Sequence, residues 1–166
     1  MSRLGVDIRD RGTGVSTGRG AAGRPVLLAT LGVPLSEEAS VFAVDTAVES
    51  GQRLVVANVT ALEPLRMSIT LGYDALPELT PEVSASLRRS AELARSLGVH
   101  VERLRVRSPR PVQALVDLIA DVRPGLFVFG PDRGALRERR YRKALGAVRD
   151  RVTCLVWVPN DAAGRP

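Results

Sequence analysis

The chain has 166 residues, a length that suits one domain with a sizeable core. Apolar residues make up 45% and charged residues 25%, close to the average of globular proteins. No apolar run is long enough to cross a bilayer or to act as a signal peptide, and the single cysteine excludes an intrachain disulfide framework. We therefore expect a cytoplasmic protein with no membrane segment.

The net charge of +6 comes almost entirely from arginine, since Lys143 is the only lysine. Arginine suits phosphate and nucleic-acid recognition. A compositional bias of the coding sequence explains the preference equally well, because a solvated surface has little reason to choose arginine over lysine. The charge by itself does not establish a polyanionic partner.

The sequence predicts an N-terminal arm followed by a strand, a helix and a second strand. Residues 1–24 lack a sustained apolar period and are interpreted as flexible. Pro25–Thr30 is a continuous apolar run, typical of a strand buried on both faces. Ser36 is a candidate N-cap for a helix that reaches Ser50. The second strand is expected over 53–60.

The middle of the chain begins with a long connection over 61–79, of a length that is usually functional or variable. Thr80-Pro81-Glu82 is a strong helix start, because it places a capping side chain, a proline and an acid in order. The apolar stripe of this helix is Val83, Leu87, Ala91 and Ala94. Residues 99–107 alternate like a strand near a sheet edge.

The last third continues the alternation. Ser108-Pro109 is expected to open a helix with Val112, Leu115, Val116 and Ile119 on its apolar face. A buried strand over Leu126–Phe129 ends at Gly130. The buried stripe of the following helix is Tyr141, Ala144, Leu145 and Val148. Val152–Val158 forms the fifth strand, and 160–166 is interpreted as a flexible tail.

This alternation of strands and helices over 25–159 predicts one α/β domain. Its five-stranded parallel sheet is doubly wound and Rossmann-like, with right-handed crossovers and helices on both faces. A ligand of such a sheet binds at the carboxyl ends of the strands, where the winding reverses.

The layout and a glycine pattern after the fourth strand resemble the universal stress protein family. That family carries G-x2-G-x9-G-(S/T) at this place; the chain has Gly130, Gly134 and Gly146. The resemblance covers Pro25 to Pro159. It implies an adenine-nucleotide site near these glycines and dimerisation through the last strand. The proline that often starts that strand is replaced by Thr153-Cys154.

The nucleotide motif departs from the family pattern in several places. Leu31 stands where nucleotide-binding members carry an aspartate that recognises adenosine. The glycine spacings are three and eleven residues instead of two and nine. Pro131 offers no N–H, Asp132 brings negative charge, and Ala147 replaces the family's hydroxyl. These changes predict a degenerate nucleotide site.

Arginine-rich sequence after Gly130 supports the opposite interpretation, because guanidinium groups can replace backbone donors to phosphate. We expect an accessory or regulatory protein of the stress response that acts by binding and has no resident cofactor. The alternative is a nucleotide-binding protein with ATP or AMP as its ligand and slow hydrolysis at most. Any anion is expected near a set of residues at the ends of the strands: Thr30, Gly32, Val59, Gly130, Arg133, Gly134 and Gly146.

No catalytic or metal-binding motif stands out, so we do not expect an enzyme. The only histidine, His100, has no second ligand near it in sequence, and Cys154 lies in an apolar run typical of a buried thiol. Asp45 and Glu49, four apart on the first helix, are interpreted as solvated.

Two surfaces are candidates for interaction. Residues 137–143 form a basic stretch that could recruit an acidic partner or nucleic acid, although its charges fall on more than one helical face. We interpret it as a solvated face and expect a protein rather than a nucleic acid as partner. The last strand is expected at a sheet edge, where pairing with a second copy would cover it and give a homodimer.

Overall fold

Strands and helices alternate along the chain as expected. The computed structural model describes residues 23–62 and 80–159. Within these ranges the elements are β1 (Val26–Thr30), α1 (Glu37–Ser50), β2 (Leu54–Ala61), α2 (Pro81–Ser96), β3 (Val101–Ser108), α3 (Pro111–Val122), β4 (Leu126–Phe129), α4 (Glu138–Arg151) and β5 (Leu155–Trp157). Most of the chain assigned to an arm (1–22), most of the 61–79 connection (63–79) and the tail (160–166) lie outside the described residues.

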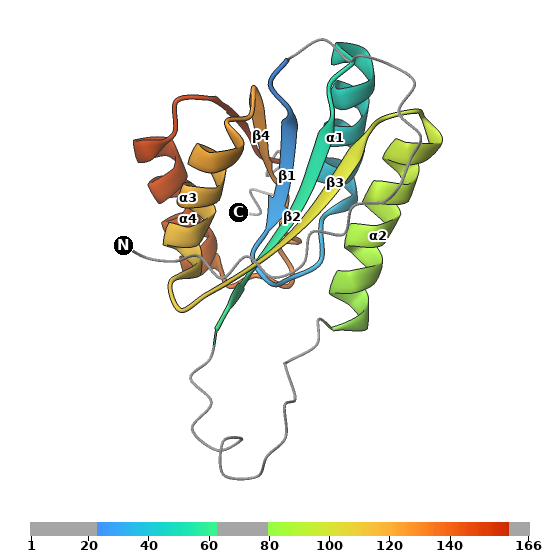
Figure 1. Cartoon of the computed structure of the whole chain (residues 1–166). Helices are drawn as coiled ribbons and strands as arrows, with labels where there is room; N and C mark the ends of the chain where they lie inside the picture. The colour runs from blue at the N-terminus through green and yellow to red at the C-terminus, as the bar shows by residue number, and fades with distance from the viewer. Residues whose placement is uncertain (1–22, 63–79, 160–166) are drawn as a thin grey trace, which may run out of the picture.

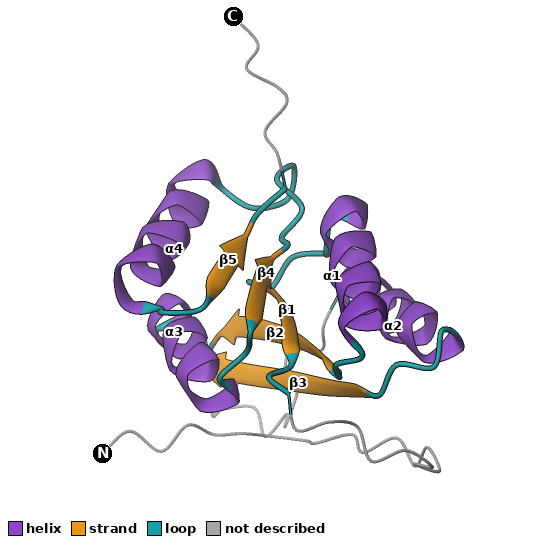
Figure 2. Ribbon diagram, turned by 90° about the horizontal axis from the view of Figure 1, so that it is seen from above, coloured by secondary structure: helices purple, strands orange, loops and turns teal. Residues whose placement is uncertain are grey.

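The five strands form one parallel sheet in the order β3-β2-β1-β4-β5. Helices α1 and α2 cover one face, and α3 and α4 cover the other (Figures 1 and 2). The chain builds outward from β1 to β3 and then crosses to the other side of β1, so the winding reverses between β1 and β4. This confirms the doubly wound fold and the edge positions of β3 and β5.

The core has two halves, because side chains of a strand alternate between its faces. On β1, Leu27 and Ala29 pack on the α3–α4 side, whereas Val26 and Leu28 pack on the α1–α2 side. All five residues of β1 are buried. A strand buried on both faces needs a continuous apolar run, which is why the pattern in the sequence identified it.

Local capping fixes the helix starts near the predicted residues. The Ser36 hydroxyl accepts the N–H of Ala39 at 3.2 Å, and Gly51, with φ of 64°, ends α1. The Thr80 hydroxyl accepts the N–H of Val83 at 3.4 Å, and Pro81 is the first residue of α2. The predicted stripe of α2 is confirmed as buried.

Three boundaries or burial assignments were wrong. Helix α3 begins at Pro111 and not at Ser108-Pro109, because β3 stays paired with β2 as far as Ser108. Strand β5 spans only Leu155–Trp157 instead of 152–158, because the N–H of Val152 still bonds to α4 at the Val148 carbonyl. Leu145 is half-buried rather than buried.

None of the helices in the described part of the chain is both long and apolar enough to cross a membrane.

Candidate ligand site at the carboxyl end of the sheet

The loops that follow β1 and β4 meet at the carboxyl end of the sheet, where the winding reverses. Their backbones are bonded to each other: the N–H of Ser36 donates to the Gly130 carbonyl at 2.8 Å, and the N–H of Asp132 donates to the Pro34 carbonyl at 2.8 Å. Leu35 and Pro131 form an isolated antiparallel bridge. The two loops that would flank a ligand are therefore held against one another.

The end of β1 turns inward. Thr30 is fully buried, and its hydroxyl donates to the Val33 carbonyl at 2.7 Å. Leu31 is only 1% exposed and belongs to the same hydrophobic cluster as Leu136 and Tyr141. The position expected to carry the family's aspartate is thus part of the core, packed with side chains from the β4–α4 segment.

Gly32 has a left-handed backbone with φ of 70°, which glycine adopts without strain. Its N–H donates to Oδ1 of Asn58 at 2.9 Å. Asn58 lies near the end of β2 and is 1% exposed, and its Nδ2 has no hydrogen-bond partner among the described groups. The sequence interpretation missed Asn58; the signal was a single amide within the apolar run of β2. Its neighbour Val59 is fully buried in the α3–α4 half of the core.

Gly130 serves packing rather than anion binding. Its N–H already donates to the Ala29 carbonyl at 3.0 Å. A Cβ at this position would lie 2.6 Å from Cβ of Ala39 and 3.0 Å from Cδ1 of Leu28. The absent side chain therefore lets α1 approach the sheet closely.

Asp132 accepts three N–H groups of the β4–α4 loop. The Asp132 carboxylate accepts the N–H of Gly134 at 2.9 Å. The Asp132 carbonyl accepts the N–H groups of Ala135 and Leu136 at 3.1 and 3.0 Å. Pro131 has no N–H to offer. Three consecutive N–H groups, those of Gly134, Ala135 and Leu136, are thus already bonded within the loop, whereas α4 begins without a side-chain cap.

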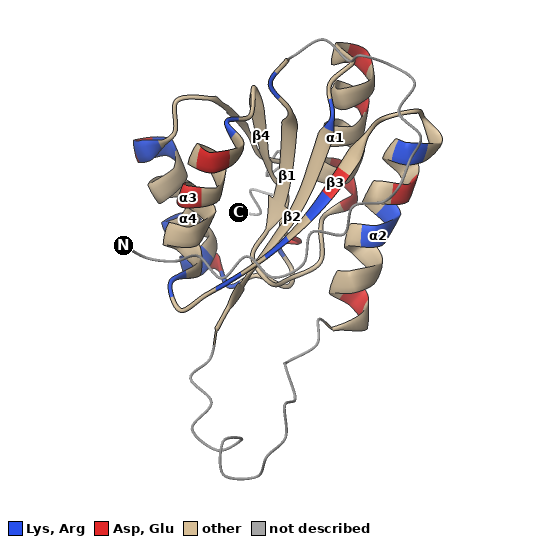
Figure 3. Ribbon diagram, viewed as in Figure 1, with Lys and Arg blue, Asp and Glu red and all other residues tan. Residues whose placement is uncertain are grey.

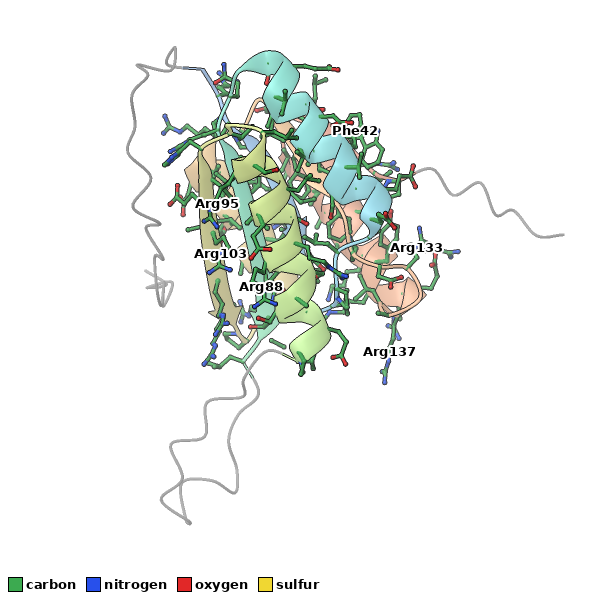
Figure 4. All side chains as sticks on the ribbon, turned by 90° about the vertical axis from the view of Figure 1, so that its right-hand side faces the viewer. Phe42, Arg88, Arg95, Arg103, Arg133 and Arg137 are labelled. Atoms are coloured by element: carbon green, nitrogen blue, oxygen red, sulfur yellow. The ribbon has the colours of Figure 1, made fainter. Side chains whose placement is uncertain are left out.

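Arg133 is engaged by neighbouring side chains. Its Nη2 donates to Oε2 of Glu138 at 2.6 Å, and its guanidinium carbon lies 3.7 Å from the centre of the Tyr141 ring. Nε of Arg142 donates to the other oxygen of Glu138 at 2.8 Å. Hydrogen bonds from Arg133 and then Arg142 lower the pKa of the Glu138 carboxyl below its ordinary range. Figure 4 shows Arg133 and Arg137 at the start of the α4 segment.

The structure separates one predicted site residue from the rest. Thr30, Gly32, Gly130 and Gly134 lie in the two loops or at their ends. Gly146, by contrast, lies inside α4, and nothing comes within 4 Å of the place where its Cβ would be. The third glycine of the presumed motif is therefore a helix-interior residue and not a loop residue.

The other candidate residues show no site. His100 is exposed and precedes β3, and Asp45 and Glu49 are exposed on α1. Cys154 is half-buried just before β5, and burial raises the pKa of its thiol. Residues 23–62 and 80–159 contain no group of three or more histidine, cysteine or acidic side chains placed to hold a metal ion.

The family model described as the universal stress protein family matches residues 23–159, which is most of the chain. The chain belongs to the universal stress protein family. This agrees with the parallel five-stranded sheet and confirms the resemblance inferred from the sequence.

Solved structures of this family share the fold. A universal stress protein in complex with cAMP is 24% identical with a TM-score of 0.54, and the match covers 83% of this chain and 97% of that one. One from Burkholderia pseudomallei is 18% identical with a TM-score of 0.56, covering 84% and 97%. One from Archaeoglobus fulgidus in complex with dAMP is 19% identical with a TM-score of 0.55, covering 81% and 95%. No curated protein matches the chain significantly.

Proposed function

We propose that this universal stress protein acts in the stress response by binding another protein rather than by catalysis, and that it does not hold an adenine nucleotide tightly. The observation that carries the proposal is the bond between the Asp132 carboxylate and the N–H of Gly134. In this loop a side-chain carboxylate accepts a backbone N–H that a phosphate oxygen could otherwise accept.

Physical chemistry makes that exchange unfavourable for a nucleotide. A phosphate at Gly134 would displace the carboxylate from its donor and then lie beside it, so that two anions would share one small region. Arg133 does not offset this readily, because it already donates to Glu138. Leu31, in the core, offers no acceptor for a ribose hydroxyl or adenine amine.

The alternative function is adenine-nucleotide binding, which is favoured by the cAMP and dAMP bound to two proteins of the same fold. Isothermal titration calorimetry with millimolar ATP, AMP and cAMP separates the two. We expect no measurable heat of binding for the natural chain. The variant Asp132→Ala should gain weak binding, because it frees the Gly134 N–H and removes a charge.

Asp45→Ala is the matched control, since it removes an exposed acid on α1 that takes part in none of the loop's hydrogen bonds described above. It should leave binding unchanged. Micromolar binding of ATP by the natural chain, or nucleotide that remains with the purified protein, would contradict the proposal and support the alternative.

We also propose that the chain forms a homodimer through β5. This strand lies at the edge of the sheet, and its one neighbour among the described strands is β4. Leu155 on β5 is 74% exposed, the most exposed of the large apolar side chains in residues 23–62 and 80–159. An uncovered apolar edge favours pairing, and a two-fold axis would cover both copies at once.

Light scattering during gel filtration tests the dimer. The natural chain should elute as a dimer at micromolar concentration, and Leu155→Arg should shift it to a monomer, because two like charges would face each other across the axis. Leu97→Arg is the control, since Leu97 is 52% exposed at the end of α2. A natural chain of monomeric mass would rule the proposal out.

Nucleic acid is not the partner we propose. The basic stretch 137–143 is partly neutralised, because Glu138 within it binds both Arg133 and Arg142. Binding to nucleic acid through phosphates weakens steeply with salt. We expect no shift in gel-retardation assays even at low salt; a retarded band that disappears as salt is added would show that this surface binds nucleic acid.

A further inference from the structure

A cavity lies at the amino end of the sheet, opposite to the loops described above. Its volume is about 300 Å³. Three arginines contribute to its lining, namely Arg24, Arg123 and Arg151, together with Cys154. Val116 and Ile119 of α3 supply apolar surface. A volume of this size falls at the small end of pockets that hold small organic ligands.

The three arginines come from separate segments that the fold brings together. Arg24 precedes β1, Arg123 follows α3, and Arg151 ends α4. Basic residues at the start of β1 and the end of α4 are visible at this end of the molecule in Figure 3. The N–H of Gly125 donates to the Pro25 carbonyl at 3.0 Å, which holds the segments before β4 and β1 side by side.

The charge of this cluster is not balanced locally. None of the ion pairs found in residues 23–62 and 80–159 involves Arg24, Arg123 or Arg151. Arg151 donates to the neutral Oε1 of Gln113, a bond that anchors the guanidinium on α3 without neutralising it. All three arginines are exposed, and three positive charges on the lining of one cavity favour a bound anion, most of all at low salt.

Arg123 has an unusual backbone. Its φ of 50° is the only positive φ of a non-glycine residue in the described part of the chain. It ends α3, and its N–H donates to the Ile119 carbonyl at 2.9 Å. Glycine would make the same bond without strain. An arginine in the last turn of α3 would also balance the helix dipole without strain, so neither capping nor the dipole explains this side chain.

We propose that this cavity binds a small organic anion. Its phosphate or carboxylate group would be held by the guanidinium groups of Arg24 and Arg123, whose planar donors match such oxyanions, and Arg151, bonded to Gln113, would add positive charge. Its apolar body would lie against Val116 and Ile119. Strained residues gather at functional sites. The backbone of Arg123 is strained, and its side chain would contact the ligand. The site is independent of the β4–α4 loop and of the proposed function.

Phenyl phosphate is a suitable probe, because it combines a phosphate with a compact apolar ring. Cys154, the only cysteine of the chain, gives a direct readout through its alkylation by neutral iodoacetamide. We expect millimolar phenyl phosphate to slow this reaction at least twofold at low salt, with saturation. Benzyl alcohol, which lacks the charge, should not slow it.

The decisive variant is Arg123→Gly. It should weaken phenyl phosphate binding at least about tenfold, the loss expected when a charge-assisted hydrogen bond is removed. Its unfolding midpoint should equal or exceed that of the natural chain, because glycine relieves the backbone strain. Arg149→Ala is the matched control: it removes a charge from the same end of α4 but does not line the cavity, and it should change affinity less than about twofold.

Three results would overturn the proposal: alkylation of Cys154 that phenyl phosphate does not slow, equal protection by inorganic phosphate alone, or equal weakening by Arg149→Ala and Arg123→Gly. The last would mean diffuse attraction rather than a site. Benzoate tests which head group is bound. If benzoate protects Cys154 at the same concentration, the site accepts carboxylates as well as phosphates. If benzoate does not protect it, the site is specific for phosphates. Arg24→Gln should also weaken binding and provides a second, structurally neutral check.

Discussion

The two ends of the sheet differ in how their polar groups are used. At the carboxyl end, the loops after β1 and β4 bond to each other, and Asp132 accepts N–H groups within its own loop. At the amino end, three arginines line a cavity, and none of them forms an ion pair with another described residue. Folds of this kind ordinarily place their ligand at the carboxyl end. Here the N–H groups of Gly134, Ala135 and Leu136 at that end are bonded within the loop, and three arginines without a described ion pair line a cavity at the other end. Family membership therefore identifies the scaffold, while the satisfaction of individual polar groups decides where it can bind.

The largest effect is expected at Leu31, where a substitution tests whether the carboxyl end of the sheet is closed. Leu31→Asp restores the acid of nucleotide-binding relatives, but in this chain it places an unpaired carboxylate in the core. We expect a loss of about 4 kcal/mol in the free energy of unfolding. Urea denaturation followed by circular dichroism measures it, with Leu62→Asp at a 48% exposed leucine as control. A stable Leu31→Asp protein that binds ATP would show that the cleft is open.

The next largest effect is expected at Gly130, where contact between the loop and α1 closes the carboxyl end. Gly130→Ala would force its Cβ to 2.6 Å from Ala39 and should destabilise the domain by about 2–3 kcal/mol. Gly134→Ala is the comparison, because the nearest atom to its Cβ is the Asp132 carboxylate at 3.3 Å. Equal stability of the two variants in urea would disprove the packing role of Gly130.

At Gly146 we expect the opposite effect on stability from that at Gly130. Because it is a helix-interior residue with open space around it, Gly146→Ala should stabilise the protein by about 0.5–1 kcal/mol. The melting temperature should rise accordingly. Gly51→Ala, at a φ of 64°, should lower it. A destabilised Gly146→Ala protein would mean that this glycine has a packing or ligand role that the geometry does not reveal.

The smallest effect concerns Glu138, which neutralises arginines at the carboxyl end. Its folded-state pKa lies below the ordinary 4.5 because of Arg133 and Arg142. A lowered pKa stabilises the protein above the unfolded-state pKa, and this stabilisation disappears as pH falls through the folded-state value. Glu138→Gln should therefore melt slightly below the natural chain at neutral pH, and the two should converge in strong acid. A difference that persists in strong acid would contradict the pairing.

Much of the fold could be predicted from the sequence, because strands buried on both faces require continuous apolar runs and surface helices require apolar stripes. The boundaries that failed depend on tertiary contacts. Both Ser108-Pro109 and Arg110-Pro111 can open a helix, and pairing with β2 selects the second. Strand β5 pairs with only three residues of β4, whatever the length of its own apolar run.

The candidate site was less predictable. Glycine spacing alone grouped Gly146 with the residues expected near an anion, whereas it lies inside α4, which begins at Glu138 with no side-chain cap to mark its start. The bond from Gly134 to Asp132 and the amide of Asn58 beneath Gly32 depend on side-chain directions that the sequence does not give. The left-handed Arg123 precedes Pro124, and a proline disfavours helical backbone before it without selecting the left-handed region.

The only tryptophan, Trp157 on β5, stacks on Phe42 of α1 with ring centres 4.0 Å apart and planes at 9°. This contact joins the last strand of the sheet to its first helix, so the emission of the single indole senses whether β5 is docked. If that emission changes at a lower urea concentration than the helical circular dichroism, the edge strand detaches before the rest of the domain unfolds. The natural sequence thus carries its own optical probe for fraying of the edge through which we propose two copies to meet.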